Sequence, residues 1–235
     1  MTTFKEIRGT AVESVSSDPT NPEVGQIWYN NTIGVLKGNL LVAAAWASGG
    51  NLGTTRQLLA GAGTQTAGLG FGGNSGGYLA NTEKYDGTSW TSTGNLNTAR
   101  AILGGAGLQT AALAFSGEFT PGYSNSTESF NGSTWTSVNP INTARSYISG
   151  CGTQTAALAF GGSTGALSSA TELWDGTGWT SVPSLSTARA ALAGAGIQTV
   201  GLAFGGYSGT PDVTNVTEEW SGPQTTVTAS TLTTS

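Results

Sequence analysis

The sequence predicts an all-β protein built from four copies of one structural unit, preceded by a segment of a different kind. Only 9% of the 235 residues are charged, whereas Gly fills 37 positions. Thr and the seven Trp, seven Phe and six Tyr residues are good strand formers. A set of landmark residues recurs about every 44 residues, and three units contain an Asp-Gly or Asn-Gly pair, which is typical of hairpin turns.

The repeat is defined by landmarks that follow one another in a fixed order. Each unit begins with an Arg, and the four Arg residues are spaced by 44, 45 and 44 positions. A Gln follows nine residues later, then a Phe before two small residues, then a Glu with an aromatic residue two positions after it. The Arg residues are Arg56, Arg100, Arg145 and Arg189, and the Glu residues are Glu83, Glu128, Glu172 and Glu218.

Each unit is expected to form four short strands. In the second unit the strands are predicted over residues 100–107, 110–115 and 127–130, with a fourth that begins at Trp135. The Asn-Gly pair at residues 131–132 predicts the turn between the last two. Large and small residues alternate in the second strand, as expected for sheets that stack on neighbours through both faces.

This order of landmarks resembles the kelch repeat, over about residues 40–222. The resemblance implies a β-propeller in which each unit is one blade, and four units predict a four-bladed ring. The fourth unit has Thr225 where the others have Trp, while Trp46 lies 44 residues before Trp90.

We therefore expect Leu40 to Ser48 to supply the missing outer strand beside the strand that contains Trp220, which closes the ring. An open array, or a ring shared between chains, is the alternative.

The two ends of the chain lie outside the repeat. Residues 1–38 are expected to form an extended arm with a hairpin whose turn is at 31–34, and residues 223–235 form a Thr-rich tail after the propeller of residues 39–222. The segment from Asp18 to Lys37 resembles a segment near the start of tail-fibre and other virion proteins of tailed phages. The resemblance implies that the arm anchors the protein, with Trp28 and Tyr29 as the candidate anchoring residues.

The repeated Arg and Glu residues are eight of the 21 charged side chains. Because they recur in every unit, we expect structural Arg–carboxylate pairs, each within hydrogen-bonding distance of its partner or of loop carbonyls. The alternative is a charged ring that binds an ion or a sugar.

The loops between the second and third strands are the candidate ligand sites. They cover residues 74–81, 118–126, 163–170 and 207–216, and they vary in length while the framework is constant. Exposed aromatic side chains suit sugar faces or protein contacts; the alternative is that they fold back onto the sheets. The aromatic residues of these loops are Tyr78, Phe119, Tyr123 and Tyr207.

Composition excludes several chemistries. The chain has no His, which excludes His-dependent catalysis and His-ligated metal sites, and Cys151 is its one cysteine. A net charge of -5 argues against nucleic acid as a partner, and the longest apolar run, 40–47, is too short to span a bilayer. We expect no cofactor and no enzymatic activity; Glu118, Asp212 and Glu219 are the acids that a glycan hydrolase would have to use.

The sequence thus predicts a non-enzymatic structural protein of a phage particle, such as a tail fibre, cap or decoration protein. Its arm would dock on other virion proteins, and its propeller would be displayed on the particle surface, as a homo-oligomer. The N-terminus has no apolar segment of a secretory signal, so we expect synthesis in the host cytoplasm. The second hypothesis is a module that recognises host-surface carbohydrate through the loops, and the third is a glycan hydrolase.

Overall fold

The computed structural model describes residues 12–39, 44–209 and 213–223. The chain divides into two compact units, Met1–Ser48 and Gly49–Ser235, which are described separately. The described residues contain β-strands and no helix, so the predicted all-β class is confirmed for them.

The N-terminal unit is a small three-stranded sheet. Strand β2 (Ile27–Asn30) pairs antiparallel with β3 (Val35–Gly38), and the turn lies at 31–34 as predicted. Strand β1 (Glu13–Val15) pairs parallel with β2 and was not predicted. The segment between β1 and β2 is tied to this sheet, because Asp18 accepts hydrogen bonds from side chains of β2 and β3.

The second unit contains four antiparallel sheets, one for each repeat, which we number 1 to 4 along the chain. Sheets 1 to 3 have four strands and sheet 4 has three. Sheet 1 contains β4 (Ala60–Thr64), β5 (Ala67–Phe71), β6 (Thr82–Tyr85) and β7 (Trp90–Thr93), and sheet 2 contains β8 (Gly104–Leu108), β9 (Ala111–Phe115), β12 (Thr127–Phe130) and β13 (Trp135–Val138). Sheet 3 contains β14 (Ser149–Gly152), β15 (Ala157–Phe160), β16 (Thr171–Trp174) and β17 (Trp179–Val182). Sheet 4 contains β18 (Ala193–Ile197), β19 (Val200–Phe204) and β20 (Thr217–Ser221). A short hairpin, β10 (Glu118–Phe119) and β11 (Gly122–Tyr123), lies in the loop between β9 and β12.

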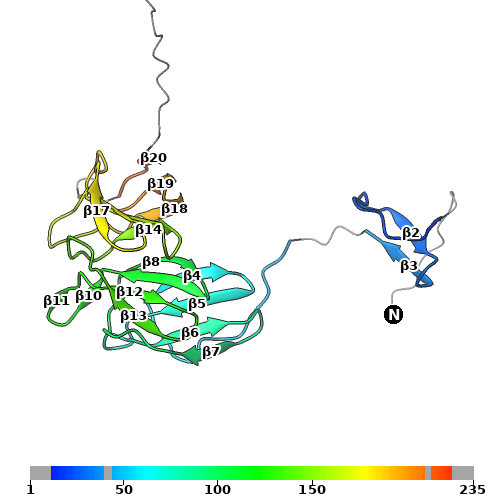
Figure 1. Cartoon of the computed structure of the whole chain (residues 1–235), viewed down its shortest axis with the longest axis horizontal. Coiled ribbons are helices and arrows are strands. Elements are labelled where there is room, and N and C mark those ends of the chain that lie inside the picture. Colours follow the sequence, from blue (N-terminus) through cyan, green and yellow to red (C-terminus); the bar gives the residue numbers. More distant parts are fainter. Residues whose placement is uncertain (1–11, 40–43, 210–212, 224–235) are drawn as a thin grey trace, which may run out of the picture. The chain divides into compact units, whose positions relative to one another are not determined.

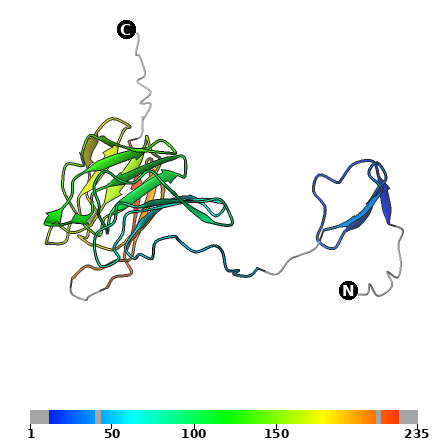
Figure 2. The ribbon, with the colours of Figure 1, turned by 90° about the horizontal axis from the view of Figure 1, so that it is seen from below.

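The four sheets stack in chain order. Their first strands β4, β8, β14 and β18 contact one another in that sequence. Figure 1 shows sheets 2 and 3 between sheet 1 and sheet 4, and Figure 2 shows the same stack from below. Because every sheet has the same strand order, each interior interface joins the same two faces.

Aromatic side chains form the core of these interfaces. Phe71 of sheet 1 packs on Trp135 of sheet 2 with ring centroids 4.9 Å apart, and Phe115 packs on Trp179 in the same way at 5.1 Å. The indole nitrogen of Trp135 donates to Thr82 Oγ1 at 2.9 Å, so its polar atom is satisfied. Each buried Phe contributes about 1.5–3 kcal/mol through the area removed from water.

Small residues in the first strands allow the sheets to approach this closely. A Cβ added to Gly105 would lie 2.8 Å from the ring of Phe71, and one added to Gly150 would lie 2.7 Å from the ring of Phe115. Glycine at these positions therefore follows from the packing of an aromatic ring from the preceding sheet.

A ladder of main-chain hydrogen bonds also connects the sheets. The amide of Ile102 donates to the carbonyl of Leu58, Tyr147 donates to Ile102, and Ala191 donates to Tyr147, at 2.9–3.1 Å. All four residues have positive φ between 51° and 58°, which non-glycine residues rarely adopt. The left-handed conformation is retained because it aligns these groups between neighbouring sheets.

The predicted closing strand, Leu40 to Ser48, is described only in part. Residues 40–43 lie outside the described part of the chain, 44–48 belong to no strand, and Trp46 is fully exposed at 101%. Among the described residues β20 is therefore the edge of sheet 4, and no contact comparable to the interior ones joins β18 to β4. The repeat places Trp46 at the spacing of the Trp residues in the other outer strands, so completion of sheet 4 by this segment remains a prediction.

Candidate functional site

The repeated Arg and Glu residues form four buried ion pairs, as predicted. The guanidinium nitrogens lie 2.6 Å from the carboxylate in Arg100–Glu128 and 2.8 Å in Arg145–Glu172, and the Arg side chains are 0% exposed. The other two pairs are Arg56–Glu83 and Arg189–Glu218.

These pairs hold the loops of each sheet together. Arg145 Nη1 donates to the carbonyls of Gly161 and Ala170, at the two ends of the loop between β15 and β16. The second carboxylate oxygen of Glu172 accepts the amide of Asn142 in the connection from the preceding sheet. The Nη groups and the carboxylates bind groups of the protein itself, whereas the Nε atom of each of the four Arg residues is buried without a hydrogen-bond partner. Because the Arg side chains are buried, we interpret the pairs as structural and not as a charged ring open to ligands.

Burial dominates the protonation behaviour of the interior pairs. Loss of water lowers the pKa of Arg100 and Arg145 from the ordinary value, although the paired carboxylates oppose the shift. At Glu218 burial by itself raises the pKa, but hydrogen bonds from Ser186 and the charge of Arg189 outweigh it, and the pKa falls below the ordinary value.

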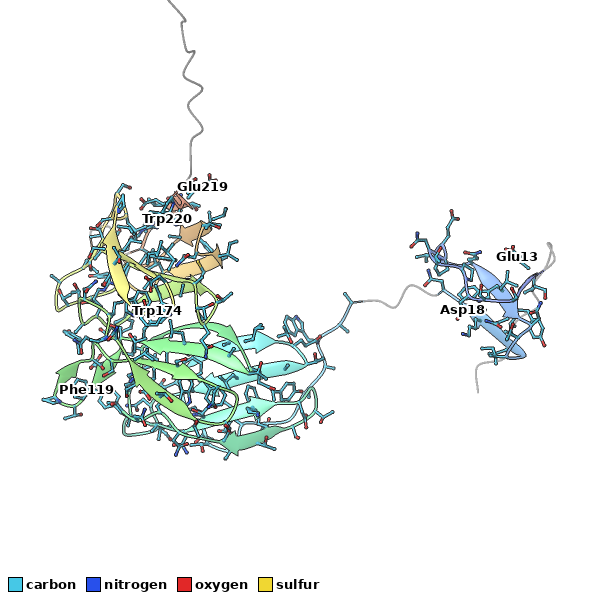
Figure 3. All side chains as sticks on the ribbon, in the orientation of Figure 1. Glu13, Asp18, Phe119, Trp174, Glu219 and Trp220 are labelled. Carbon is cyan, nitrogen blue, oxygen red and sulfur yellow. The ribbon has the colours of Figure 1, made fainter. Side chains whose placement is uncertain are left out.

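The loop aromatics divide into two groups. Tyr123 and Tyr207 are exposed, at 39% and 46%, whereas Tyr78 and Phe119 are half-buried. The Tyr78 hydroxyl donates to Glu118 Oε1 at 2.8 Å, and this hydrogen bond raises the pKa of Tyr78. Figure 3 shows Phe119 on the β10–β11 hairpin, away from the stacked sheets, so neither of the two alternatives for these side chains holds for all of them.

An open hollow of 280 Å³ lies on the same rim of the array, between sheets 3 and 4. Tyr147 and Tyr207 line it together with small side chains, and Tyr147 is 42% exposed. Sequence analysis did not single out Tyr147, because it stands two residues after the repeat Arg, where the other units have Leu, Ile and Ala. The remaining lining residues are Ser163, Leu167, Ala190 and Ala191.

The two candidate anchoring residues have different environments. Trp28 is 6% exposed and donates through its indole nitrogen to Asp18, so it belongs to the core of the N-terminal unit. Tyr29 points to the opposite face of β2, is 40% exposed and lies directly opposite Leu36 of β3, which is 56% exposed. Ile27, at 37%, completes this face.

The remaining candidate groups offer little chemistry. Glu118 is engaged by Tyr78, Glu219 is exposed on β20, and Asp212 lies outside the described residues. Burial raises the pKa of the Cys151 thiol to about 11. Within residues 12–39, 44–209 and 213–223, no group of three or more His, Cys, Asp or Glu side chains is placed to hold a metal ion.

Comparison with protein-family models and with curated proteins finds no match for this chain. Among the described residues there is no helix long and apolar enough to cross a membrane.

Proposed function

We propose that the chain is a non-enzymatic structural protein of a tailed-phage particle, on which the N-terminal unit docks and the array of sheets is displayed. The observation that carries the proposal is the exposed apolar face of the N-terminal unit, formed by Ile27, Tyr29 and Leu36. Three exposed apolar side chains on one face of a small sheet favour contact with an apolar surface of another virion protein.

The array is suited to a display role because eight of its charged side chains, the repeat Arg and Glu residues, pair with one another inside it. The four Arg side chains are 0% exposed, and each is paired with a repeat Glu. A surface dominated by Gly, Thr, Ser and Asn, with few charges, offers little for non-specific binding.

The finer proposal for the fold is that the four sheets are blades of a kelch-like β-propeller whose last blade is completed by the segment around Trp46. Sheet 4 lacks an outer strand in the described residues, and a hollow lined by Phe160, Thr171 and Trp220 lies beside it. Phe160 and Thr171 are the counterparts of Phe71 and Thr82, which hold Trp135 in the first interface.

Incorporation into particles tests the docking role. Deletion of residues 1–38, or the substitution Leu36→Asp, should leave a folded array that no longer joins its particle. Leu108→Asp is the matched control, because Leu108 is also 56% exposed but lies on sheet 2. Normal incorporation of Leu36→Asp and of the deletion variant would contradict the proposal.

The second candidate function is recognition of a host-surface carbohydrate. The hollow lined by Tyr147 and Tyr207 favours it, because aromatic rings stack on the apolar faces of sugars. A glycan array probed with the full chain should then show binding that is lost in Tyr207→Ala and kept in Tyr123→Ala. Absence of binding at millimolar sugar would leave the structural role alone.

A further inference from the structure

At every interior interface a repeat Gln of the later sheet donates to main-chain carbonyls of the earlier one, and we call these two surfaces the donor face and the acceptor face. The side-chain amide of Gln109 in sheet 2 donates to the carbonyls of Gly68 and Tyr85 in sheet 1, at 3.0 and 2.6 Å. Gln154 and Gln198 bind main-chain carbonyls of the preceding sheet in the same way. The repeat Gln therefore acts as a bridge between successive sheets.

Among the described strands of the second unit, none covers the donor face of sheet 1. Gln65 is exposed, whereas its three counterparts are half-buried. Leu59 is 37% exposed, whereas the equivalent residues of sheets 2 to 4 are 6–7% exposed. We call Leu58, Leu59, Gln65 and Trp90 the N-face.

Likewise, no described strand of the second unit covers the acceptor face of sheet 4. Phe204 is 38% exposed, against 0–2% for Phe71, Phe115 and Phe160. Thr217 is exposed, whereas Thr82, which accepts the indole of the next sheet, is 0% exposed. We call Ala191, Gly201, Phe204, Thr217 and Trp220 the C-face; Figure 3 shows Trp220 at this end of the stack.

Among the described strands, no contact like those of the interior interfaces joins the N-face to the C-face of one chain. The three interior interfaces repeat the same ladder of main-chain bonds, and the described ladder ends at Leu58 and Ala191. Packed interfaces are not continuously deformable. Closing the array on itself would change the packing at all three interfaces, whereas a second copy can meet either face without changing any of them.

We propose that the N-face of one copy of this chain docks on the C-face of a second copy, head to tail. In this contact Gln65 donates to the carbonyls of Gly201 and Trp220, and the Trp90 indole packs on Phe204 and donates to Thr217. This proposal rests on the proposed assignment of the four sheets as propeller blades. The partner is a second copy of this chain, which either completes the ring or extends the array.

The incomplete edge of sheet 4 fits the same geometry. The amide of Gly50 donates to the Thr88 carbonyl of sheet 1, as that of Gly94 donates to the Ser133 carbonyl of sheet 2. Trp46 precedes Gly50 by the same four positions that separate Trp90 from Gly94. A docked second copy therefore carries a Trp with the sequence spacing of an outer strand, and the hollow beside β20 that lacks such a Trp is lined by Phe160 and Thr171.

Analytical ultracentrifugation of the full chain over a range of concentrations tests the proposal. Gln65→Glu places a carboxylate against two carbonyl oxygens, and Phe204→Asp removes the ring of the C-face. Each should raise the concentration needed for association at least about tenfold. Gln26→Glu, with the same charge change in the N-terminal unit, and Tyr123→Asp, with a ring exposed to 39%, are the matched controls.

Mixing the two variants distinguishes a head-to-tail contact from a symmetric one. The Gln65→Glu chain keeps its C-face and the Phe204→Asp chain keeps its N-face, so the mixture should form a heterodimer that neither variant forms alone. Circular dichroism checks that each variant is folded, and Thr217→Lys replaces Phe204→Asp if that variant is not. A wild-type chain that stays monomeric, or a mixture that does not associate, overturns this inference, while the incorporation assay still tests the proposed docking role.

Discussion

Replacing Arg100 by Met removes the charged partner of Glu128 and leaves that carboxylate buried with one hydrogen bond, from the amide of Asn97 at 2.7 Å. Glu128 is 1% exposed, so water cannot compensate for the lost guanidinium. Breaking a buried pair from one side costs about 3–5 kcal/mol in the free energy of unfolding. At about 2–4 °C per kcal/mol for a domain of this size, the melting temperature should fall by about 6–20 °C.

The repeat provides a matched comparison for this substitution. Arg189→Met removes the same partner from Glu218, but that side chain is 20% exposed and retains some contact with water. We expect a loss of about 1–3 kcal/mol there. The double variant Arg100→Met with Glu128→Leu removes both charges and should recover about 2 kcal/mol or more relative to Arg100→Met.

Urea unfolding followed by tryptophan fluorescence measures all three variants. An Arg100→Met chain within about 1 kcal/mol of wild type would show that the interior pair does not support the fold. If Arg189→Met lowers the free energy of unfolding as much as Arg100→Met does, exposure of the partner carboxylate does not reduce the cost of breaking the pair.

Three further predictions concern packing, acid and thiol chemistry. Phe115→Ala should cost about 3–5 kcal/mol and Phe204→Ala about 1–2 kcal/mol in urea unfolding, because Phe115 is 0% and Phe204 38% exposed; equal losses would contradict the open end of the array. Hydrogen bonds from Lys37, Asn30 and Trp28 lower the pKa of Asp18 from 3.8 to about 2. The N-terminal unit should therefore lose stability as pH falls from about 4 toward 2, which the Trp28 indole NMR signal reports, and an unchanged signal would count against that network. Cys151, with a pKa of about 11 and 7% exposure, should react with iodoacetamide at neutral pH only after unfolding, and prompt labelling detected by mass spectrometry would refute its burial.

Much of the strand pattern could be predicted from the repeat. The third strand of the second unit spans Thr127–Phe130 and the fourth begins at Trp135, as predicted from the landmarks and the Asn-Gly turn. The first strand begins at Gly104 instead of residue 100, because Ile102 has a φ of 55° and interrupts the extended chain. A β-branched residue gives no sequence signal for a left-handed conformation, which only the ladder between sheets explains.

Side-chain contacts could be predicted where both residues of a contact recur in every unit of the sequence. The Arg–Glu pairs were predictable because both members repeat in every unit. The role of Gln109 was not, because its acceptors are main-chain carbonyls of a neighbouring sheet, which no residue type marks. The completion of sheet 4 by Trp46 stays a prediction: equivalence of spacing identifies a matching side chain, but it does not determine how successive sheets are oriented.

The interior interfaces are alike, and this likeness has a consequence for how the number of sheets can change in evolution. A sheet placed between two others uses a Gln on one side and a Phe on the other, and its first strand contacts the first strands of both neighbours. Duplication of a 44-residue segment of the gene would therefore insert one more sheet with both of its faces satisfied and without redesign of the rest. The number of sheets is thus a variable that recombination can adjust, while the two terminal faces stay constant.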